Sequence, residues 1–301
     1  MPFLKKPKFL IIGGALLVAV VLAVILLFMP RGATIGFYGL EQNAEETIRL
    51  QERLAEKGYS IYFAQTLQDL EDTDCNAWVI QTSSDVFAEK ILSIVGEKAV
   101  FIGQKPSLSQ TVRYAGLDMV QAGEQLADLL TRLPNHGDTN ENGTVSCLLL
   151  TAPEGYKEKT DFEQGLYGKL EENAQPYVVL DTLSCSLTVE AGTQSTLASL
   201  SAYGRDIEVI FAASEVLATG AAQAIKEGGW EISRDLYLLA LGHTDDSITA
   251  LNEQQRSGLV FASWEEIEDL VLDAVADAVD GCAPKEYLLP FRIFTNASPL
   301  Q

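Results

Sequence analysis

Residues 207–242 constrain the fold more than any other stretch of this sequence. The stretch opens with an apolar run, residues 209–213, that is short and β-rich like a buried parallel strand. A helix is expected to follow from Ser214, a typical N-cap residue, to the glycines at 228 and 229, and a second apolar run covers residues 236–241. This is the pattern of a β-α-β unit. Parallel sheets hold ligands at the carboxyl ends of their strands, so a site is expected at residues 213–215 and 242–245.

The same alternation of apolar runs and amphipathic helices fills the chain from residue 34 onward. It predicts an α/β fold with helices layered on parallel sheet. A polar loop at residues 135–143 is expected to lie on the surface, because the strand pattern continues beyond it. The predicted strands are 34–38, 60–64, 77–80, 99–102, 112–116, 145–150 and 177–183, and the predicted helices are 45–56, one capped by Ser83 or Ser84, 122–133, 161–172, 190–200 and one from Trp264.

The N-terminus carries a different signal. Lys5, Lys6 and Lys8 precede 21 uncharged residues, 9–29, which as a helix would span roughly 32 Å. We expect a transmembrane anchor there, with residues 1–8 as a cytoplasmic basic tip and the rest of the chain outside the cell membrane. A cleaved signal peptide is the alternative, and it is disfavoured by the length of the apolar run and the lack of a small-residue cleavage site.

The expected outer part is strongly acidic, with 18 Lys and Arg against 42 Asp and Glu, a net charge of −24. Such a surface repels phosphate backbones and anionic headgroups, so nucleic acid and a second, peripheral membrane contact are not expected as partners. The four cysteines lack the short paired spacings of metal sites. They are interpreted as small buried residues rather than disulfide partners. They are Cys75, Cys147, Cys185 and Cys282.

Sequence motifs of enzymes are missing. The chain has no Gly-x-Ser-x-Gly elbow, no phosphate-binding GxxxxGK[ST] loop and no HExxH, and it has only two histidines, His136 and His243. We therefore expect a protein that is not an enzyme and that needs no cofactor or metal.

Several segments resemble type I periplasmic binding proteins and the sensor domains of LacI-type repressors. FAASEVLATGAAQAIKEGG and LLALGHTDD resemble the family patterns FAxNDxMAxGAxxAxxxxG and VxGFDG, and VRYAGLDMVQAGEQLADLL resembles YxGxDNxxAGxxxAxxL. TIGFYG, EKGYSIYFAQ, WVIQTSSD and VSCLLLTAPEGYKEKTDFEQGL fit in the same order. The resemblance implies two doubly wound parallel-sheet lobes joined by a three-strand hinge within residues 33–301. Lobe one would be about 33–115 and 265–289, and lobe two about 116–264 and 290–301.

The sugar-binding residues of that family are mostly replaced. The family's aromatic turn after the first strand reads Leu40, Glu41, Gln42 and Asn43 here. The family's Asp-Arg pair is replaced by Gln104 and Lys105, and its Asn-Asp pair is replaced by Ser214 and Glu215. The aspartate of its GFDG motif is replaced by Thr244, and the arginine ahead of its second-lobe helix is replaced by Thr160 or Phe162. The bidentate clamps on sugar hydroxyl groups are therefore depleted.

A different set of side chains is expected to line the cleft. Four of them also have a structural explanation that needs no ligand. Ser214 can cap a helix, Glu215 can interact with the dipole of the helix whose first turn it occupies, His243 can be a solvated loop residue, and Trp264 can pack in the core. Lys105 is expected beside Glu215, which would leave the cleft near neutral and suit an uncharged ligand. The expected ligand-binding residues are Tyr38, Gln42, Gln81, Gln104, Lys105, Tyr156, Ser214, Glu215, His243, Asp245 and Trp264.

The resemblance implies a membrane-tethered extracytoplasmic solute-binding protein, like the sugar-binding component of an ABC transporter. It would close two lobes on a small polar solute such as a sugar, and present the closed form to a transporter permease or a membrane signalling partner. The depleted clamps keep a second hypothesis open, a regulatory or sensory interaction domain that retains the fold without a ligand.

Overall fold

The computed structural model describes residues 32–173 and 176–296. The predicted basic tip (1–8) and anchor (9–29) lie outside these residues. Within the described part, no helix combines the length and the apolar character needed to cross a membrane.

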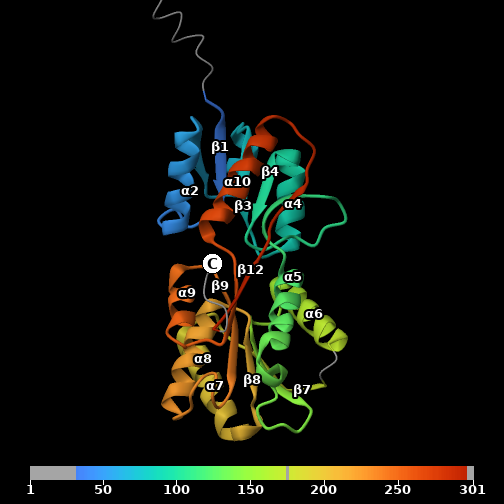
Figure 1. Cartoon of the computed structure of the whole chain (residues 1–301). Coiled ribbons are helices and arrows are strands. Elements are labelled where there is room, and N and C mark those ends of the chain that lie inside the picture. The colour runs from blue at the N-terminus through green and yellow to red at the C-terminus, as the bar shows by residue number, and fades with distance from the viewer. Residues whose placement is uncertain (1–31, 174–175, 297–301) are drawn as a thin grey trace, which may run out of the picture.

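The described chain forms two α/β lobes, one above the other in Figure 1. Lobe one contains a six-stranded, all-parallel sheet in the order β11-β5-β4-β3-β1-β2. Its strands are β1 (Thr34–Tyr38), β2 (Ser60–Ala64), β3 (Ala77–Gln81), β4 (Ala99–Ile102), β5 (Arg113–Leu117) and β11 (Glu286–Leu289). Its helices are α2 (Glu45–Glu56), α3 (Leu67–Asp72), α4 (Asp85–Val95), the short η1 (Gly96–Lys98) and α10 (Trp264–Val279).

Each face of this sheet is covered by two helices. Leu50 and Leu54 of α2 and Val275 of α10 pack with Ile35 and Val79 on one face. The other face packs against α3 and α4, and its core includes the fully buried Trp78. Both faces of the strands are thus apolar, as the continuous apolar runs predicted.

Lobe two contains a second six-stranded sheet, in the order β12-β10-β9-β8-β6-β7. Five strands are parallel, and the edge strand β12 runs antiparallel to β10. Its strands are β6 (Val145–Thr151), β7 (Tyr177–Ser184), β8 (Val209–Ala212), β9 (Tyr237–Gly242), β10 (Gly258–Phe261) and β12 (Arg292–Thr295). Its helices are α5 (Met119–Asp128), η2 (Leu129–Arg132), η3 (Pro134–Gly137), α6 (Lys157–Glu172), α7 (Val189–Tyr203), η4 (Gly204–Asp206), α8 (Glu215–Glu227) and α9 (Asp245–Asn252).

Helices α5 and α6 cover one face of this sheet, and α7 and α8 cover the other. The helices of each pair touch through glycine. A Cβ on Gly165 of α6 would lie 1.9 Å from the carbonyl oxygen of Val120, and one on Gly220 of α8 would lie 2.3 Å from that of Val189. The missing side chains let the helix backbones approach closely.

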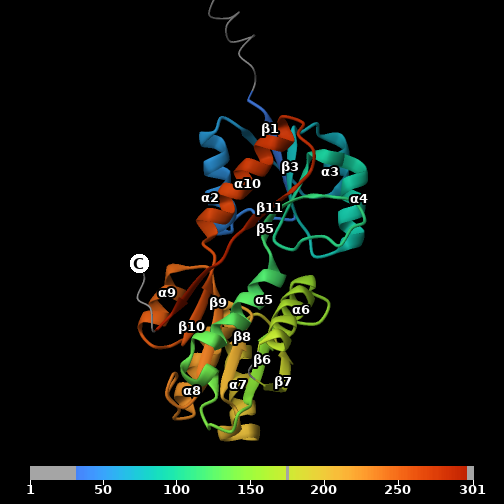
Figure 2. The same ribbon diagram turned by 45° about the vertical axis from the view of Figure 1, so that its right-hand side comes forward.

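The chain passes between the two sheets three times, after β5, after β10 and after β11 (Figure 2). The predicted fold class, two parallel-sheet lobes connected by three segments, is confirmed for the described residues. The residue boundaries given above for the lobes stay a prediction.

The expected strands and helices are found within a few residues, with two α-helices and three strands added. Helix α6 begins at Lys157, four residues before the predicted start, while α3, α9, β10, β11 and the antiparallel β12 were not among the predicted elements. The polar loop is held by the fully buried Glu208, whose carboxylate accepts hydrogen bonds from the backbone of Thr139 (2.8 Å), Asn140 (3.1 Å) and Ser146 (2.8 Å). This loop is therefore fastened to the core rather than projecting freely.

The four cysteines, all within the described residues, are free. Cys75, Cys147 and Cys185 are buried, as expected. The expectation is wrong for Cys282, which is exposed in the turn between α10 and β11.

Candidate ligand-binding site

The carboxyl ends of the parallel strands of both sheets point toward the junction between the lobes (Figure 1). The loops after β1, β3, β4 and β9 and the start of α10 therefore meet in one region, as predicted for a sheet-edge site. Three cavities occupy this region. We call them the lobe-one cavity, the side cavity and the hinge cavity.

The lobe-one cavity has a volume of about 340 Å³ and lies at the strand ends of lobe one. Its floor is apolar, and its polar groups include Glu41, Gln81 and Glu268. Its lining residues are Leu40, Glu41, Ala44, Glu46, Thr47, Leu50, Gln81, Ile102, Gly103, Trp264, Ile267, Glu268 and Val271.

The side cavity has a volume of about 470 Å³ and is lined from both lobes. Helix α2 contributes Arg49 and Arg53, and the start of α9 contributes His243, Thr244 and Asp245. The remaining lining residues are Glu52, Glu56, Ser263, Trp264, Glu265 and Glu268. Loops from the two lobes thus face one space, as a site between lobes requires.

Trp264 lines both of these cavities. It is the first residue of α10, where the chain has just crossed from β10 into lobe one, and it is 39% exposed. Its ring lies 5.8 Å from the ring of His243, with an angle of 50° between the planes. Nδ1 of His243 lies 3.2 Å from the carbonyl oxygen of Ala262, and burial lowers the pKa of this histidine. A neutral imidazole therefore supports one part of the indole, and the rest remains free for a ligand.

Glu215 organises the loop that carries His243. Its carboxylate accepts a hydrogen bond from the backbone N–H of His243 at 3.0 Å and another from the hydroxyl of Thr244. Burial acts to raise the pKa of Glu215, but the hydrogen bonds from Thr244 and His243 outweigh it, and the pKa lies below its ordinary value. Glu215 thus positions the loop as a carboxylate and does not line any of the three cavities.

Lys105 does not lie beside Glu215, and the expected pairing is wrong. Its ammonium lies 2.8 Å from the carboxylate of Glu286, on the neighbouring strand β11, and both side chains line the hinge cavity. Ser214 is the N-cap of α8, since its hydroxyl accepts from the N–H of Leu217 at 3.2 Å. The structural reading of Ser214 is therefore confirmed.

Of the eleven expected binding residues, Gln81, Lys105, His243, Asp245 and Trp264 line the three cavities. The others do not. Tyr38 packs partly buried against the core around Trp78, Tyr156 is the exposed N-cap position of α6, and Ser214, Glu215, Gln42 and Gln104 complete this second group.

A network of charges between α2 and α10 was not predicted. Glu268 accepts from Arg49 at 3.0 Å and from Arg53 at 3.2 Å, and Arg53 also pairs with Asp269. Glu268 is only 6% exposed, so its charge needs these partners. The sequence signal for this network is weak, because Arg49 and Glu268 are 219 residues apart in the chain.

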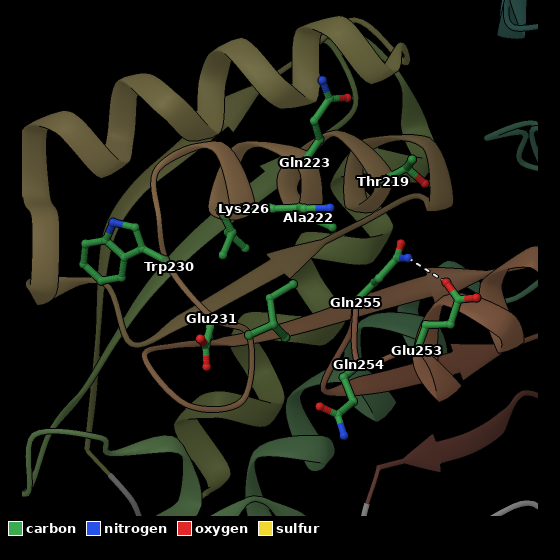
Figure 3. Close-up of a pocket in the computed structure, with 11 residues that line it drawn as sticks. Thr219, Ala222, Gln223, Lys226, Trp230, Glu231, Glu253, Gln254 and Gln255 are labelled. Carbon is green, nitrogen blue, oxygen red and sulfur yellow. Dashed lines mark hydrogen bonds between the residues drawn. The ribbon is translucent and has the colours of Figure 1, made fainter.

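A larger cavity, about 570 Å³, lies elsewhere, on the outer side of α8 (Figure 3). It is lined by lobe two alone, with Thr219, Gln223 and Lys226 from the helix and Trp230 from the following loop. Arg205 lies over the Trp230 ring at 5.4 Å. This cavity is remote from the strand ends, so size alone does not make it the candidate site.

The cavities bring together groups that can bind a small polar molecule. In the described chain, no cluster of three or more His, Cys, Asp or Glu side chains has an arrangement that could hold a metal ion. The polar groups of the site are carboxylates, an amide and paired arginines around one indole ring. Such a set can accept hydrogen bonds from hydroxyl groups and stack against an apolar ring face.

Comparison with protein-family models gave no match, and comparison with curated protein sequences gave none either. Solved structures do match. A galactofuranose binding protein is 15% identical, with a TM-score of 0.73 over 88% of this chain and 95% of that one. GanP, a glucose-galactose binding protein from Geobacillus stearothermophilus, is 14% identical, with a TM-score of 0.73 over 90% and 100%.

XylFII, in a structure described as a XylFII-LytSN complex, is 16% identical, with a TM-score of 0.71 over 89% of this chain and 99% of that one. These similarities extend over nearly the whole of each matched chain. The protein therefore has the two-lobed fold of type I periplasmic binding proteins, and the resemblance in the sequence is confirmed at the level of fold.

Proposed function

We propose that this protein is an extracytoplasmic solute-binding protein that closes its two lobes on a small, uncharged sugar. The observation that carries the proposal is the place of Trp264, which lines both the lobe-one cavity and the side cavity at the point where the chain crosses between lobes. An indole ring that both lobes can reach suits the apolar face of a sugar ring. The solved structures of the same fold include sugar-binding proteins, which supports this reading.

The charges at the site favour an uncharged ligand. Arg49 and Arg53 are engaged by Glu268 and Asp269, and Lys105 is engaged by Glu286. The remaining acceptors, such as the Glu41 carboxylate and the Gln81 amide, can receive hydrogen bonds from sugar hydroxyl groups. An anionic sugar would face these carboxylates, and among the described residues each lysine and arginine that lines the three cavities is already paired with a carboxylate.

The first prediction concerns ligand binding. We expect the full chain to be stabilised by a neutral monosaccharide and not by the matching uronic acid, which adds a carboxylate to the same ring. A sugar present at about 100 times its dissociation constant should raise the free energy of unfolding by about 2.7 kcal/mol. Thermal unfolding against a panel of neutral pyranoses and furanoses measures this. Stabilisation by the uronic acids alone would contradict the proposal.

The second prediction concerns location. We propose that residues 9–29 anchor the protein in the cell membrane with residues 33–301 outside, because three lysines precede the apolar run and Arg31 alone follows it closely, and the more positive flank stays in the cytoplasm. Protease added to intact cells or protoplasts should therefore remove the two lobes. An intact protein after this treatment, in cells whose other exposed proteins are cleaved, would contradict the placement.

One observation favours the second candidate function, an interaction domain without a ligand. Three residues that were expected to bind a ligand already have partners within the protein. Lys105 pairs with Glu286, Ser214 accepts a hydrogen bond from the N–H of Leu217, and Glu215 accepts one from the N–H of His243. A fold of this kind can serve a partner protein, as the complex of XylFII with LytSN illustrates for that chain. Native mass spectrometry of the purified protein separates the two: a co-purified sugar supports binding, and its absence together with an unresponsive sugar panel supports the interaction domain.

A further inference from the structure

The hinge cavity, about 160 Å³, contains charged groups from both lobes. It lies beside β5 and β11, where two of the three connections leave lobe one, and against α5 and the start of α6 in lobe two. Movement of the lobes must therefore change its shape. Its lining residues are Lys105, Tyr114, Leu117, Asp118, Met119, Val120, Lys157, Glu158, Asp161, Glu286 and Leu288.

Glu158 is the unsatisfied group in this cavity. Its Oε2 atom is shielded from solvent and has no hydrogen-bond partner in the described structure. Burial raises the pKa of its carboxyl group, and the nearby Asp161 carboxylate adds to the rise. A buried carboxylate oxygen without a donor costs free energy, so a cation that reaches it would be favoured.

The other three carboxylates at the cavity have partners, each a helix N–H or a lysine. Asp118 accepts from the N–H of Gln121 at 3.1 Å, Asp161 is paired with Lys157 on the same helix, and Glu286 lies 2.8 Å from Lys105. The ion pair of Lys157 therefore lies wholly within lobe two. Lys105 is the cation at the cavity that belongs to lobe one and can change its position relative to Glu158.

Two like charges line the hinge cavity from opposite lobes. Glu286 is on lobe one and Glu158 is on lobe two, so narrowing of the hinge cavity moves one carboxylate toward the other. Lysine carries three N–H donors, and Lys105 has Glu286 as its carboxylate partner in the described structure. The same ammonium can therefore donate to a second carboxylate without giving up the first.

We propose that Lys105 bridges Glu286 and Glu158 when the lobes close, and that this bridge sets the ratio of closed to open protein. The proposal rests on the proposed function in one respect, that the lobes close. It assigns Lys105 and Glu158 to control of the hinge instead of contact with the ligand.

The test measures the distance between the lobes without any sugar. Spin labels are placed on the full chain at Glu71→Cys in α3 and Glu171→Cys in α6, both exposed positions, with Cys282→Ser to remove the exposed native thiol. Lys105→Met should lower the closed-to-open ratio about tenfold, since it leaves two carboxylates facing each other. Lys105→Arg should restore the ratio.

The matched control is Lys98→Met. Lys98 also forms an ion pair within lobe one, with Asp74 at 2.7 Å, a distance close to that of the Lys105–Glu286 pair. It does not line the hinge cavity, so its replacement should leave the closed-to-open ratio unchanged. Adding Glu158→Gln to Lys105→Met should recover most of the loss, while Glu158→Gln in the wild-type background should lower the ratio. If either residue had only a structural role, each substitution would lower the closed-to-open ratio and the double variant would show the sum of the two losses. The proposal instead predicts that Glu158→Gln lowers the ratio in the wild-type background and raises it in the Lys105→Met background.

A trapping experiment detects rare closure. In the Cys282→Ser background without the spin-label cysteines, Lys105→Cys with Glu158→Cys should be joined by a bis-maleimide whose spacer is about as long as a lysine–glutamate bridge, since a direct disulfide needs a much shorter Cβ separation, whereas Lys98→Cys with Glu158→Cys should not be joined. Additive losses in the variant series, or a wild-type distance that never shortens together with no Lys105–Glu158 crosslink, overturn the proposal. Neither readout uses a sugar, so failure here is distinguishable from failure of the sugar-binding proposal, which the unfolding panel measures.

Discussion

Gly165→Ala is expected to lower the free energy of unfolding by about 3 kcal/mol, the upper range for overpacking in a core. The added Cβ would lie 1.9 Å from the carbonyl oxygen of Val120, which is backbone and cannot swing aside as a side chain can. Helices α5 and α6 would have to separate, which would loosen the apolar contacts around Phe162 that hold them on the sheet. Urea denaturation of the full chain, followed by circular dichroism, measures the change.

Gly168 provides the matched control on the same helix. A Cβ at Gly168 meets nothing within 4 Å, so Gly168→Ala should raise stability by about 0.5–1 kcal/mol, the gain of alanine over glycine inside a helix. If both substitutions change stability by the same amount and sign, the close approach of α5 and α6 is not what the glycine at 165 provides.

Trp264→Ala is expected to weaken sugar binding about 100-fold, equivalent to about 2.7 kcal/mol, the loss typical of a tryptophan at the centre of an interface. The indole lines both cavities and is partly exposed, so its removal takes away the stacking surface with a smaller effect on folding than loss of a buried tryptophan. Calorimetry with the most stabilising sugar of the panel measures the affinity.

Trp230→Ala is the control for this experiment. Trp230 is also a partly exposed tryptophan, but it lies in the outer cavity of lobe two, away from the strand ends (Figure 3). Its loss should leave the affinity unchanged. Equal weakening by both substitutions would point to a general effect on the fold, and weakening by Trp230→Ala alone would move the site to the outer side of α8.

The fold was largely predictable because its signals are local. Each buried strand is an apolar run, and caps such as Ser84 and Ser214 bond to the N–H three residues on, as their positions before helices predicted. The missed strands differ in their local signals. Strand β10 is a four-residue apolar run like β4 and β8, so its signal is as strong as theirs, whereas β12 takes its direction from pairing with β10, which no pattern within β12 itself encodes.

Sequence reasoning could predict only those residues of the candidate site that lie directly at or after the end of a strand. Gln81 ends β3, and His243 and Asp245 follow β9, so the sheet geometry placed them correctly at the cavities. Contacts between distant segments could not be predicted in this way. Lys105 meets Glu286 because β11 inserts beside β5 only after the chain has passed through β6–β10 of lobe two, and Arg49 meets Glu268 because α10 also follows these strands.

The late position of β11 and β12 also bears on how the protein is made. Each sheet receives an edge strand from the last part of the described chain, β11 for lobe one and β12 for lobe two. A polypeptide emerging from the ribosome would have formed β1–β5 and β6–β10 long before these strands exist, leaving β5 and β10 with unpaired backbone groups. Neither lobe can complete its sheet until its edge strand, β11 or β12, has been translated, and chains stopped before Glu286 would leave both sheets incomplete and prone to pair with other chains.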